Sequence, residues 1–366
     1  MGKIYTALGL MSGTSMDGVD ASIIKTDGKS YYKAILDDYL EYPRSIYNDL
    51  TTLRDKIKTS KDLKKHQKQI KSIEKRITIF HGKLVNKIIK KTKTNIDFVG
   101  FHGQTIFHNA EEKTTKQIGN GKLLSKLTKK TVVYDFRSND LKNGGEGAPL
   151  APIFHQMLER KFNIKPVSFF NIGGILNKTT IGNNGKLSAK DVGPGMCLID
   201  KWIRINSKKK YDVNGDIAKS GKQNEKVLCY YLDTFQASSR DKKSYDISNF
   251  DISFAKDLSL KDGAATLTFY TANFFNAHFQ NNKMLKVKEN VILCGGGRKN
   301  KFLVDIIKSY NKNVKLIDDY GIDGDFVESQ AFAYLAIRSY LKLPISFPES
   351  TGCKKPCTGG VIVKNF

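Results

Sequence analysis

A turn rich in glycine, serine and aspartate lies near the start of the chain, at Ser12–Asp20. Apolar runs typical of strands lie on both sides of it, at Ile4–Leu10 and Val19–Thr26. Glycines let backbone N–H groups converge on an anion, and serine and threonine hydroxyls add donors. The turn therefore predicts a phosphate-binding loop between two strands. It is neither a Walker A loop nor a dinucleotide fingerprint, because it has no Gly-Lys-Ser/Thr and a strand follows it.

Two more glycine turns follow apolar strands later in the chain. Asn171–Gly174 ends the run Val167–Asn171, and Gly295–Asn300 ends the run Val291–Cys294. The last turn leads into a predicted helix from Lys299, whose N-terminus favours anions. A single glycine hairpin is more often only a turn. Three such turns at strand ends, in two halves of the chain, are the arrangement of the actin-like fold that closes on ATP.

The elements that position the first turn are predicted from periodicity. Tyr31–Tyr42 would complete an antiparallel meander, and Pro43 opens a helix. Within Arg54–Lys93, apolar residues recur every three or four positions and mark one buried stripe of a helix whose lysines face water. A basic helix on a membrane surface is disfavoured, because the stripe has a single phenylalanine. The stripe is Ile70, Ile73, Ile77, Phe80, Leu84 and Ile88.

The rest of the pattern alternates strands and helices, which predicts an α/β fold. Strand, glycine turn and strand occur near the start of each half, which indicates a divergent internal duplication. We expect a first domain at 1–165, completed by the tail 346–366, and a second domain at 166–345. Strands are predicted at Phe98–Phe101, Thr131–Phe136 and Ile175–Ile181, and helices at Ala148–Arg160, around Gly263–Asn281 and at Glu328–Leu341.

Composition and charge limit the class of protein. The chain has 366 residues, 40% hydrophobic and 27% charged, as in a globular protein with a sizeable core. No apolar run approaches the roughly 18–20 residues that span a bilayer, and no signal-peptide cleavage region is present, so a cytoplasmic location is expected. The five cysteines are odd in number and widely spaced. We therefore expect reduced thiols, and no zinc site at Cys353 and Cys357.

The net charge of +25 would ordinarily indicate nucleic acid or an acidic membrane as a partner. Only nine of the 61 basic residues are arginine, however, and no platform of interleaved arginines and aromatic residues occurs. Arginine is the residue that base and phosphate readers favour. A lysine-rich solvated surface is therefore favoured over specific nucleic-acid binding.

Ten short motifs follow one another along almost the whole chain. They are Gly9–Asp20, Gly100–His108, Gln117–Gly119, Asp135–Asp140, Gly144–Pro152, Asn171–Asn177, Asp191–Gly195, Asp212–Gly221, Leu293–Asn300 and Glu328–Ala336. In this order they resemble the anhydro-N-acetylmuramic acid kinase family, in the sugar-kinase branch of the actin-like ATPase superfamily. The resemblance implies a two-domain, ribonuclease-H-like ATPase fold with an interdomain nucleotide cleft. It also implies ATP-dependent opening of 1,6-anhydro-N-acetylmuramic acid and its phosphorylation to N-acetylmuramic acid 6-phosphate in peptidoglycan recycling.

The resemblance assigns roles to single residues. Asp191 matches the family's catalytic base, which would activate water against the anomeric carbon, and its alternative role is a helix N-cap. Arg137 suits the lactyl carboxylate because its fork binds carboxylates bidentately, and its alternative is a surface arginine at a strand end. His102 and His108 favour packing or a polar contact over a metal site. The expected sugar contacts are Ser12, Gln104, Glu328 and, more weakly, Asp135.

ATP and Mg²⁺ are the cofactors that the resemblance implies. Mg²⁺ would be carried mostly by phosphates and water, with Asp17 as the carboxylate in its first or second shell. The expected ATP contacts are Gly13, Thr14, Ser15, Met16, Asp17, Gly18, Val19, Asp20, Gly173, Gly174, Gly295, Gly296, Gly297 and Asn300.

The chain departs from the family pattern at Met196, where asparagine is usual, at Glu146, where glutamine is usual, and in Lys243–Phe250. One competing function is a non-enzymatic actin-like ATP switch, which would need the glycine turns but neither Arg137 nor Asp191. A lysine-rich nucleic-acid-binding protein is the other. The expected partners are a small amino sugar and a second copy of the chain in a homodimer, with no membrane and no specific nucleic acid.

Overall fold

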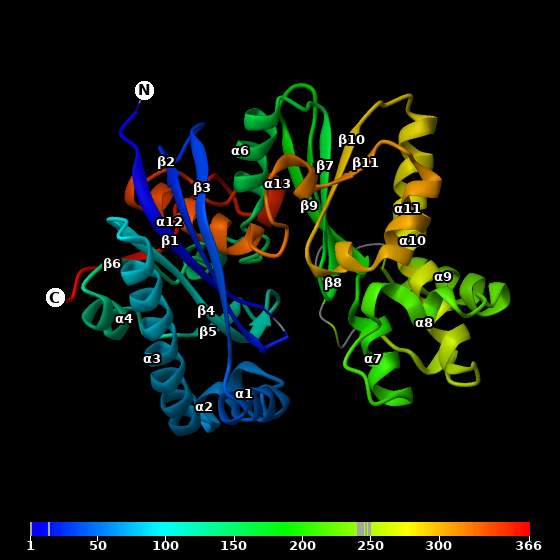
Figure 1. Ribbon diagram of the computed structural model, residues 1–366, viewed down its shortest axis with the longest axis horizontal. Coiled ribbons are helices and arrows are strands. Elements are labelled where there is room, and N and C mark those ends of the chain that lie inside the picture. The colour runs from blue at the N-terminus through cyan, green and yellow to red at the C-terminus, as the bar shows by residue number, and fades with distance from the viewer. Residues whose placement is uncertain (1, 14, 240–244, 246, 248–249) are drawn as a thin grey trace. The chain divides into compact units, whose positions relative to one another are not determined.

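The computed structural model describes residues 2–13, 15–239, 245, 247 and 250–366. It divides into two compact units (Figure 1): unit 1 is Met1–Asn163 with Phe326–Phe366, and unit 2 is Ile164–Asp325. The first boundary lies two residues from the one expected at 165. The segment 326–345, expected in the second domain, clusters with unit 1 instead. The reason is that α12 (Val327–Tyr340) packs on the strands of that unit.

The sheet of unit 1 begins with the predicted antiparallel meander. β1 (Tyr5–Ser12) pairs with β2 (Gly18–Thr26), which pairs with β3 (Tyr32–Glu41). On its other side β1 is parallel to β4 (Phe98–Asn109), and β4 is parallel to β6 (Thr131–Tyr134). The order across the sheet is β12-β6-β4-β1-β2-β3. β5 (Thr114–Ile118) pairs with the far part of β4, and β12 (Val361–Val363) pairs with β6.

Helices cover this sheet, and the apolar stripe predicted from the sequence lies on α3 (Gln67–Thr92). Five of its six residues are buried in the core and Phe80 is partly buried against it. Pro43 is the N-cap of α1 (Arg44–Lys56), as its missing N–H favours. The other helices of unit 1 are α2 (Ser60–Lys65), α4 (Gly121–Thr128), α5 (Ser138–Lys142), α6 (Pro152–Phe162) and α13 (Pro348–Thr351).

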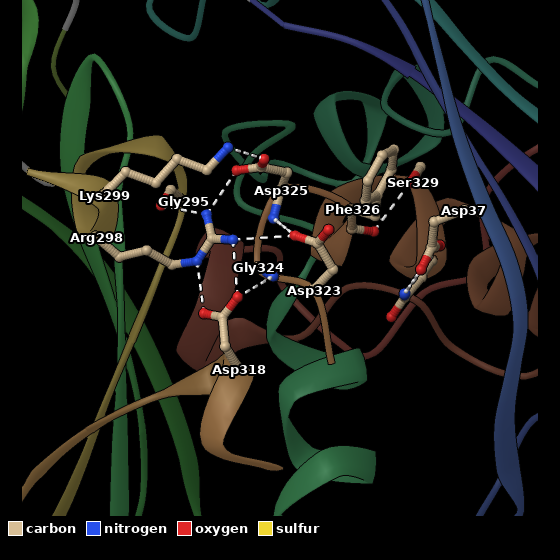
Figure 2. Close-up of polar contacts among 11 residues, drawn as sticks. Asp37, Gly295, Arg298, Lys299, Asp318, Asp323, Gly324, Asp325, Phe326 and Ser329 are labelled. Atoms are coloured by element: carbon tan, nitrogen blue, oxygen red, sulfur yellow. Dashed lines mark hydrogen bonds and ion pairs between the residues drawn. The ribbon is translucent and has the colours of Figure 1, made fainter. Parts of the chain in front are cut away.

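α12 lies directly on the backbone of β1 and β4. Gly9 and Gly100 are partners in the register of these strands. A Cβ at Gly9 would come within 1.9 Å of Ser329 O, and one at Gly100 within 2.3 Å of Phe332 O. The first turn of the helix is also fixed by Ser329, whose Oγ lies 2.6 Å from Ser22 Oγ. Ser329 Oγ also donates to Phe326 O at 2.9 Å (Figure 2). The sheet thereby sets the position of the helix and of Glu328.

Unit 2 repeats the strand order of unit 1. Three antiparallel strands, β7 (Val167–Ile172), β8 (Ile175–Ile181) and β9 (Leu187–Pro194), are followed across the sheet by β10 (Asn290–Cys294) and β11 (Val314–Leu316), parallel to β7. The order is β11-β10-β7-β8-β9. This repetition supports the predicted duplication, and it confirms the α/β, actin-like fold class. The helices are α7 (Cys197–Asn206), α8 (Asp216–Lys219), α9 (Glu225–Ser239), α10 (Leu260–Met284) and α11 (Lys301–Tyr310).

No helix among the residues that the structure describes has the length and apolarity that crossing a membrane requires.

Candidate functional site

The polar motifs of unit 1 meet where β1 and β6 end. Ser12, at the end of β1, is the register partner of Gln104, and Tyr134, at the end of β6, is the partner of Phe101. Because parallel strands end at the same edge of a sheet, Ser12–Gly13, His102–Gln104 and Asp135–Arg137 are brought together there. The sequence predicted site residues in each of these segments. The edge therefore gathers the side chains expected to bind the sugar.

Gln104 is fully buried at this edge and keeps one unused acceptor. Its Nε2 donates to Gly13 O at 2.9 Å, which ties β4 to the first glycine turn. Its Oε1 is buried and has no hydrogen-bond partner among the described residues. A buried acceptor left unpaired costs about 1–3 kcal/mol, so a ligand hydroxyl that donated to Gln104 would remove this cost.

Ser12 is also buried, but its hydroxyl is used within the protein. His81 Nδ1 lies 2.9 Å from Ile77 O, so Nδ1 carries the proton and Nε2 accepts from Ser12 Oγ at 3.3 Å. Ser12 Oγ in turn lies 2.9 Å from Tyr42 Oη. The structure therefore brings Ser12 to the site but gives its side chain protein partners.

Arg137 is half-buried at this edge and, among the described residues, donates only to neutral acceptors. Its Nε and Nη2 lie 3.0 and 2.9 Å from His102 Nε2, and its Nη1 donates to Gly147 O at 2.8 Å. These contacts use three of its five N–H groups. Among the described residues no carboxylate lies within 4.0 Å of the guanidinium. The surface-arginine alternative is thus wrong for Arg137, because its partners are buried groups of the site.

The charges around Arg137 act on one another at longer range. Burial lowers the pKa of Arg137 to about 10, while Glu328 and Asp140 act in the other direction. Burial also raises the pKa of Glu328, and Arg137 opposes that shift. Glu328, in the first turn of α12, therefore lies near the guanidinium without pairing with it. The structure brings these two predicted sugar contacts to one place.

Asp135 and Asp140 shape the loop that carries Arg137. Asp135 has a left-handed backbone with φ 56°, and its side chain accepts a hydrogen bond from Ser138 Oγ at the start of α5. Asp140 is buried, and accepts from Gly147 N at 2.7 Å and from Thr351 Oγ1 at 2.6 Å. Asp140 thus holds the same Gly147 that accepts from Arg137. Asp135 has a local partner, which favours a role in the loop.

The side chains of the first glycine turn fall into two groups. Met16 has φ 59° and is buried with Val19 in the core, so neither side chain is open to a ligand. Asp17 is exposed, and its Oδ1 accepts from Ser15 Oγ at 2.7 Å.

Gly18 packs on Tyr39, which leaves no room for a Cβ. Asp20 lies half-buried in β2, and Thr14 lies outside the described residues.

The glycine turns of unit 2 differ in what their glycines face. Gly173 O accepts from Met196 N, and Gly174 O accepts from Gly195 N, which joins this turn to the start of α7. A Cβ at Gly295 would meet Asn171 Oδ1 at 2.3 Å, and one at Gly297 would meet Ile172 at 2.3 Å.

Gly296 lies between these two packed glycines, and a Cβ added to it would have no other atom within 4 Å among the described residues. Gly13 and Gly173 meet only ordinary contacts, at 3.7 and 3.5 Å. A phosphate could approach the backbone at these three positions. Asn300, expected at the nucleotide, is the N-cap of α11 and accepts from Leu303 N, while its buried Nδ2 has no partner among the described residues.

Arg298 follows the third glycine turn and is wholly engaged by protein oxygens (Figure 2). It forms a bidentate pair with Asp318 at 2.7 and 3.0 Å, and further pairs with Asp323 at 3.0 Å and Asp325 at 2.6 Å. Its Nη1 also donates to Gly295 O at 3.1 Å, and Lys299 pairs with Asp325. The cluster ties the turn to the loop before α12, and leaves Arg298 no N–H for a phosphate.

Asp191 lies within β9, opposite Asn177 of β8. The N-cap of α7 is Met196, so the helix-cap alternative for Asp191 is wrong. Tyr245 N donates to Asp191 Oδ2 at 2.8 Å, and this carboxylate is half-buried. Tyr245 belongs to the stretch Lys243–Phe250, where the sequence departs from the family pattern. Residues 243–244, 246 and 248–249 of this stretch lie outside the described residues.

Sequence reasoning missed some of the contacts that build the site. The polar contact expected of His102 is confirmed, but Arg137 was not predicted as its partner. From the sequence, Asp140 was named only as the last residue of the motif Asp135–Asp140 and was given no role. The sequence shows no third ligand for Cys353 and Cys357, yet their sulfur atoms and an Asp140 oxygen lie within 4.8 Å of one another. None of the described cysteines forms a disulfide.

Comparison with solved structures gives distant likenesses. The activator of the 2-hydroxyisocaproyl-CoA dehydratase from Clostridium difficile with bound ADPNP is 12% identical, with TM-score 0.44 over 91% of this chain and 94% of that chain. A ROK family glucokinase from Streptomyces griseus in complex with glucose and AMPPNP is 13% identical, with TM-score 0.40 over 90% and 99%.

Comparison with sequences gives close relatives along the full length. The anhydro-N-acetylmuramic acid kinase of Pelagibacter ubique is 54% identical, and that of Agrobacterium fabrum is 36% identical, each over 100% of both chains. The family model described as anhydro-N-acetylmuramic acid kinase matches residues 5–365. With these matches and the motifs in place, the chain belongs to the anhydro-N-acetylmuramic acid kinase family.

Proposed function

We propose that the protein is an ATP-dependent kinase acting on 1,6-anhydro-N-acetylmuramic acid in peptidoglycan recycling. The reaction hydrolyses the anhydro bridge and transfers the γ-phosphoryl group to the oxygen at position six, which yields N-acetylmuramic acid 6-phosphate and ADP. Full-length similarity to named kinases of this substrate supports the proposal. The structural observation that carries it is Arg137, a guanidinium at a strand edge whose described partners are all neutral.

Arg137 would bind the lactyl carboxylate of muramic acid. A charge-assisted pair with a carboxylate is the interaction that this arrangement lacks among the described protein groups. Neutral acceptors fix the orientation of the guanidinium and leave its charge for the ligand. The lactyl group distinguishes muramic acid from other amino sugars, so this contact would set substrate choice.

The other sugar contacts surround this arginine. Gln104 Oε1 would accept from a sugar hydroxyl, because it is buried without a partner among the described residues. Glu328 would also accept from a hydroxyl, and its raised pKa fits a site from which water is excluded. Ser12 and Asp135 would contribute through backbone or shared hydrogen bonds, since their side chains have protein partners.

Asp191 would act as the general base. Its carboxylate takes a proton from water, and the water oxygen forms a bond with the anomeric carbon. The bond from that carbon to the oxygen at position six breaks, and this oxygen accepts the phosphoryl group in line. The Tyr245 N–H donates to Oδ2 and so helps to orient the carboxylate. Recognition is thus assigned to unit 1 and the base to unit 2.

ATP would bind at the glycine turns through backbone N–H groups. The open positions at Gly13, Gly173 and Gly296 fit this role, because a phosphate needs close approach to the backbone. Asp17 offers an exposed carboxylate oxygen, a ligand type that suits Mg²⁺ directly or through water. Bound Mg²⁺ would neutralise charge that develops on the phosphates. We also place the protein in the cytoplasm, where ATP is available, as a homodimer.

An assay of ATP consumption with and without 1,6-anhydro-N-acetylmuramic acid tests the proposal. We expect turnover only with the sugar. In ¹⁸O-water, label should enter the anomeric hydroxyl of the first-formed product and be absent from phosphate and from the oxygen at position six. Label in inorganic phosphate would mean plain ATP hydrolysis. ATP binding without turnover would favour the non-enzymatic switch.

The variant Asp191→Asn tests the base. It keeps the shape but loses the basic lone pair, so turnover should fall by about 10²–10⁴-fold while ATP affinity stays unchanged. Asp305→Asn, at an exposed carboxylate on α11 of the same unit, is the matched control and should behave as the wild type. Near-normal turnover by Asp191→Asn would remove this residue from the chemistry.

A further inference from the structure

His102 holds Arg137 from one side by two N–H···N contacts. Both Nε and Nη2 of Arg137 point at the same ring nitrogen, His102 Nε2, at 3.0 and 2.9 Å. His102 Nδ1 lies 2.9 Å from Gly103 O, a carbonyl that can only accept. The proton of the neutral ring is therefore on Nδ1, and Nε2 is left with a lone pair for Arg137. The backbone at Gly103 thus selects the tautomer that Arg137 needs.

The ring itself is held in place by α12. His102 is buried in β4, and its ring centroid lies 4.4 Å from that of Phe332. Phe332 is four residues after Glu328, so both lie on the same face of the helix. One helix therefore packs against the ring that holds Arg137 and carries the carboxylate whose charge acts on Arg137. The third contact, from Nη1 to Gly147 O, is fixed because Gly147 N donates to Asp140.

A histidine behind the guanidinium has an electrostatic consequence. A carboxylate in the same place would hold Arg137 equally well but would neutralise it, as the aspartates do around Arg298. Burial and the charge of Arg137 lower the pKa of His102 well below its ordinary value, so the ring stays neutral. The guanidinium is oriented by an uncharged partner and keeps its full charge for an anionic ligand.

We infer that His102 is a positioning residue that aims the guanidinium of Arg137 at the carboxylate of the substrate. The inference rests on the proposed function of Arg137. It assigns part of the preference for carboxylate-bearing anhydro sugars to a residue that does not contact the sugar. Loss of the acceptor at Nε2 would let the guanidinium rotate toward its other neighbours, and the carboxylate would lose its partner.

Two substitutions separate the effect of the acceptor atom of His102 from the effect of losing its ring. His102→Leu fills space but removes the acceptor. His102→Gln places an amide oxygen near the position of Nε2 and can accept from Arg137 again. We expect kcat/KM for 1,6-anhydro-N-acetylmuramic acid to fall about tenfold or more in His102→Leu, mainly through KM, and to recover most of this loss in His102→Gln. The KM for ATP should not change.

A double-mutant cycle makes the test specific to Arg137. His102→Leu should cause no further loss in an Arg137→Ala background, and little loss on an anhydro sugar without the lactyl group. His155→Leu, which replaces another buried histidine of unit 1 on α6, is the control for general loss of packing. Thermal unfolding of each variant reports whether it folds.

The outcomes are distinct. Additive losses in the double variant, equal losses on both sugars, or wild-type kinetics of a folded His102→Leu protein would each overturn the inference about His102. Failure of the proposed function would appear differently, as a wild-type protein without sugar-dependent turnover. If His102→Leu does not fold, a His102→Gln protein that folds but shows the full substrate-selective loss would equally overturn it, since its acceptor is retained.

Discussion

Two arginines, one in each unit, are enclosed by the protein in different ways. Arg298 gives all five N–H groups to protein oxygens, and three aspartates surround it. Arg137 gives three N–H groups to a histidine nitrogen and a carbonyl, and has no ion pair within 4.0 Å among the described residues. The first charge is neutralised inside the protein, and the second is not.

The difference separates a structural arginine from a binding one. Burial would lower the pKa of Arg298, but its bonds to Asp318 and Asp325 raise it above the ordinary value. The pKa of Arg137 is lowered to about 10, so this side chain is still protonated at neutral pH. Both are cations, and what distinguishes them is whether the protein already supplies the anion. Sequence motifs that contain arginine do not show this.

The largest expected effect is on stability, in Arg298→Met. Removing the cation leaves three aspartates close together, so the free energy of unfolding should fall by about 3 kcal/mol, the lower end for a broken buried pair because the aspartates reach solvent. Arg137→Met leaves only neutral acceptors and should cost about 1–2 kcal/mol. Urea unfolding measures both, and equal losses would remove the distinction between the two arginines.

The next effect is on activity, in Arg137→Ala. Losing a charge-assisted pair with the lactyl carboxylate should lower kcat/KM by about tenfold to a hundredfold, or about 1.5–3 kcal/mol. The loss should appear with the muramic substrate and hardly at all with an anhydro sugar that lacks the lactyl group. The same relative loss on both sugars would mean that Arg137 supports the fold, as Arg298 does.

The glycine turn beside Arg298 offers a smaller and sharper contrast. Gly296→Val adds a side chain in open space, so the protein should fold normally and bind ATP about tenfold more weakly. Gly297→Val pushes into Ile172 and should instead lower the melting temperature. Calorimetric titration with ATP distinguishes them, and unchanged affinity in Gly296→Val would take this turn out of the nucleotide site.

The smallest effect is on the pH dependence of stability. Although burial acts in the other direction, Arg298 lowers the pKa of Asp318 and helps lower that of Asp325 in the folded state. Their contribution is therefore present above the unfolded value of about 3.9 and is lost as pH falls through the lower folded pKa. Arg298→Met should flatten this acid dependence.

Glu328 changes stability with pH in the opposite direction to these aspartates, because burial raises its pKa. The folded state gains from its protonation as pH falls, so Glu328→Gln should steepen the acid loss slightly. Unfolding measured at a series of acidic pH values tests both variants. An acid dependence unchanged by either would contradict the charge assignments around the two arginines.

The strands and helices with strong apolar periodicity could be predicted from the sequence, and those with polar patterns could not. The meander, the stripe on α3 and the helix α12 are examples of the first kind. β9 escaped prediction because Leu187–Pro194 shows no regular alternation of apolar and polar residues: two small residues are followed by two charged ones, on a half-buried strand next to β8. The alternative role of Asp191, a helix N-cap, is wrong because the structure places this residue in a strand.

The site residues were predicted as a set of motifs, but their partners were not. The motifs named Arg137, Gln104 and Glu328, which the sheet register brings to one edge. Two features orient the guanidinium of Arg137. One is the tautomer of His102, which the Gly103 carbonyl fixes, and the other is the loop at Gly147, which Asp140 holds. The contact between Arg137 and His102 joins residues 35 positions apart, and no local pattern records it. The expected end of the second domain, at 345, differs from the structure for a similar reason. α12 follows unit 2 in sequence but packs on unit 1.

The glycine pair under α12 has a consequence for how this protein can vary. Gly9 and Gly100 lie in the interior of a sheet, and neither contacts any proposed ligand, yet each is where a helix backbone touches a strand. Alanine at either position would lift the helix, and with it Glu328 and the Phe332 ring behind His102. In a library of random variants, these two interior positions should be as intolerant as the residues that meet the sugar.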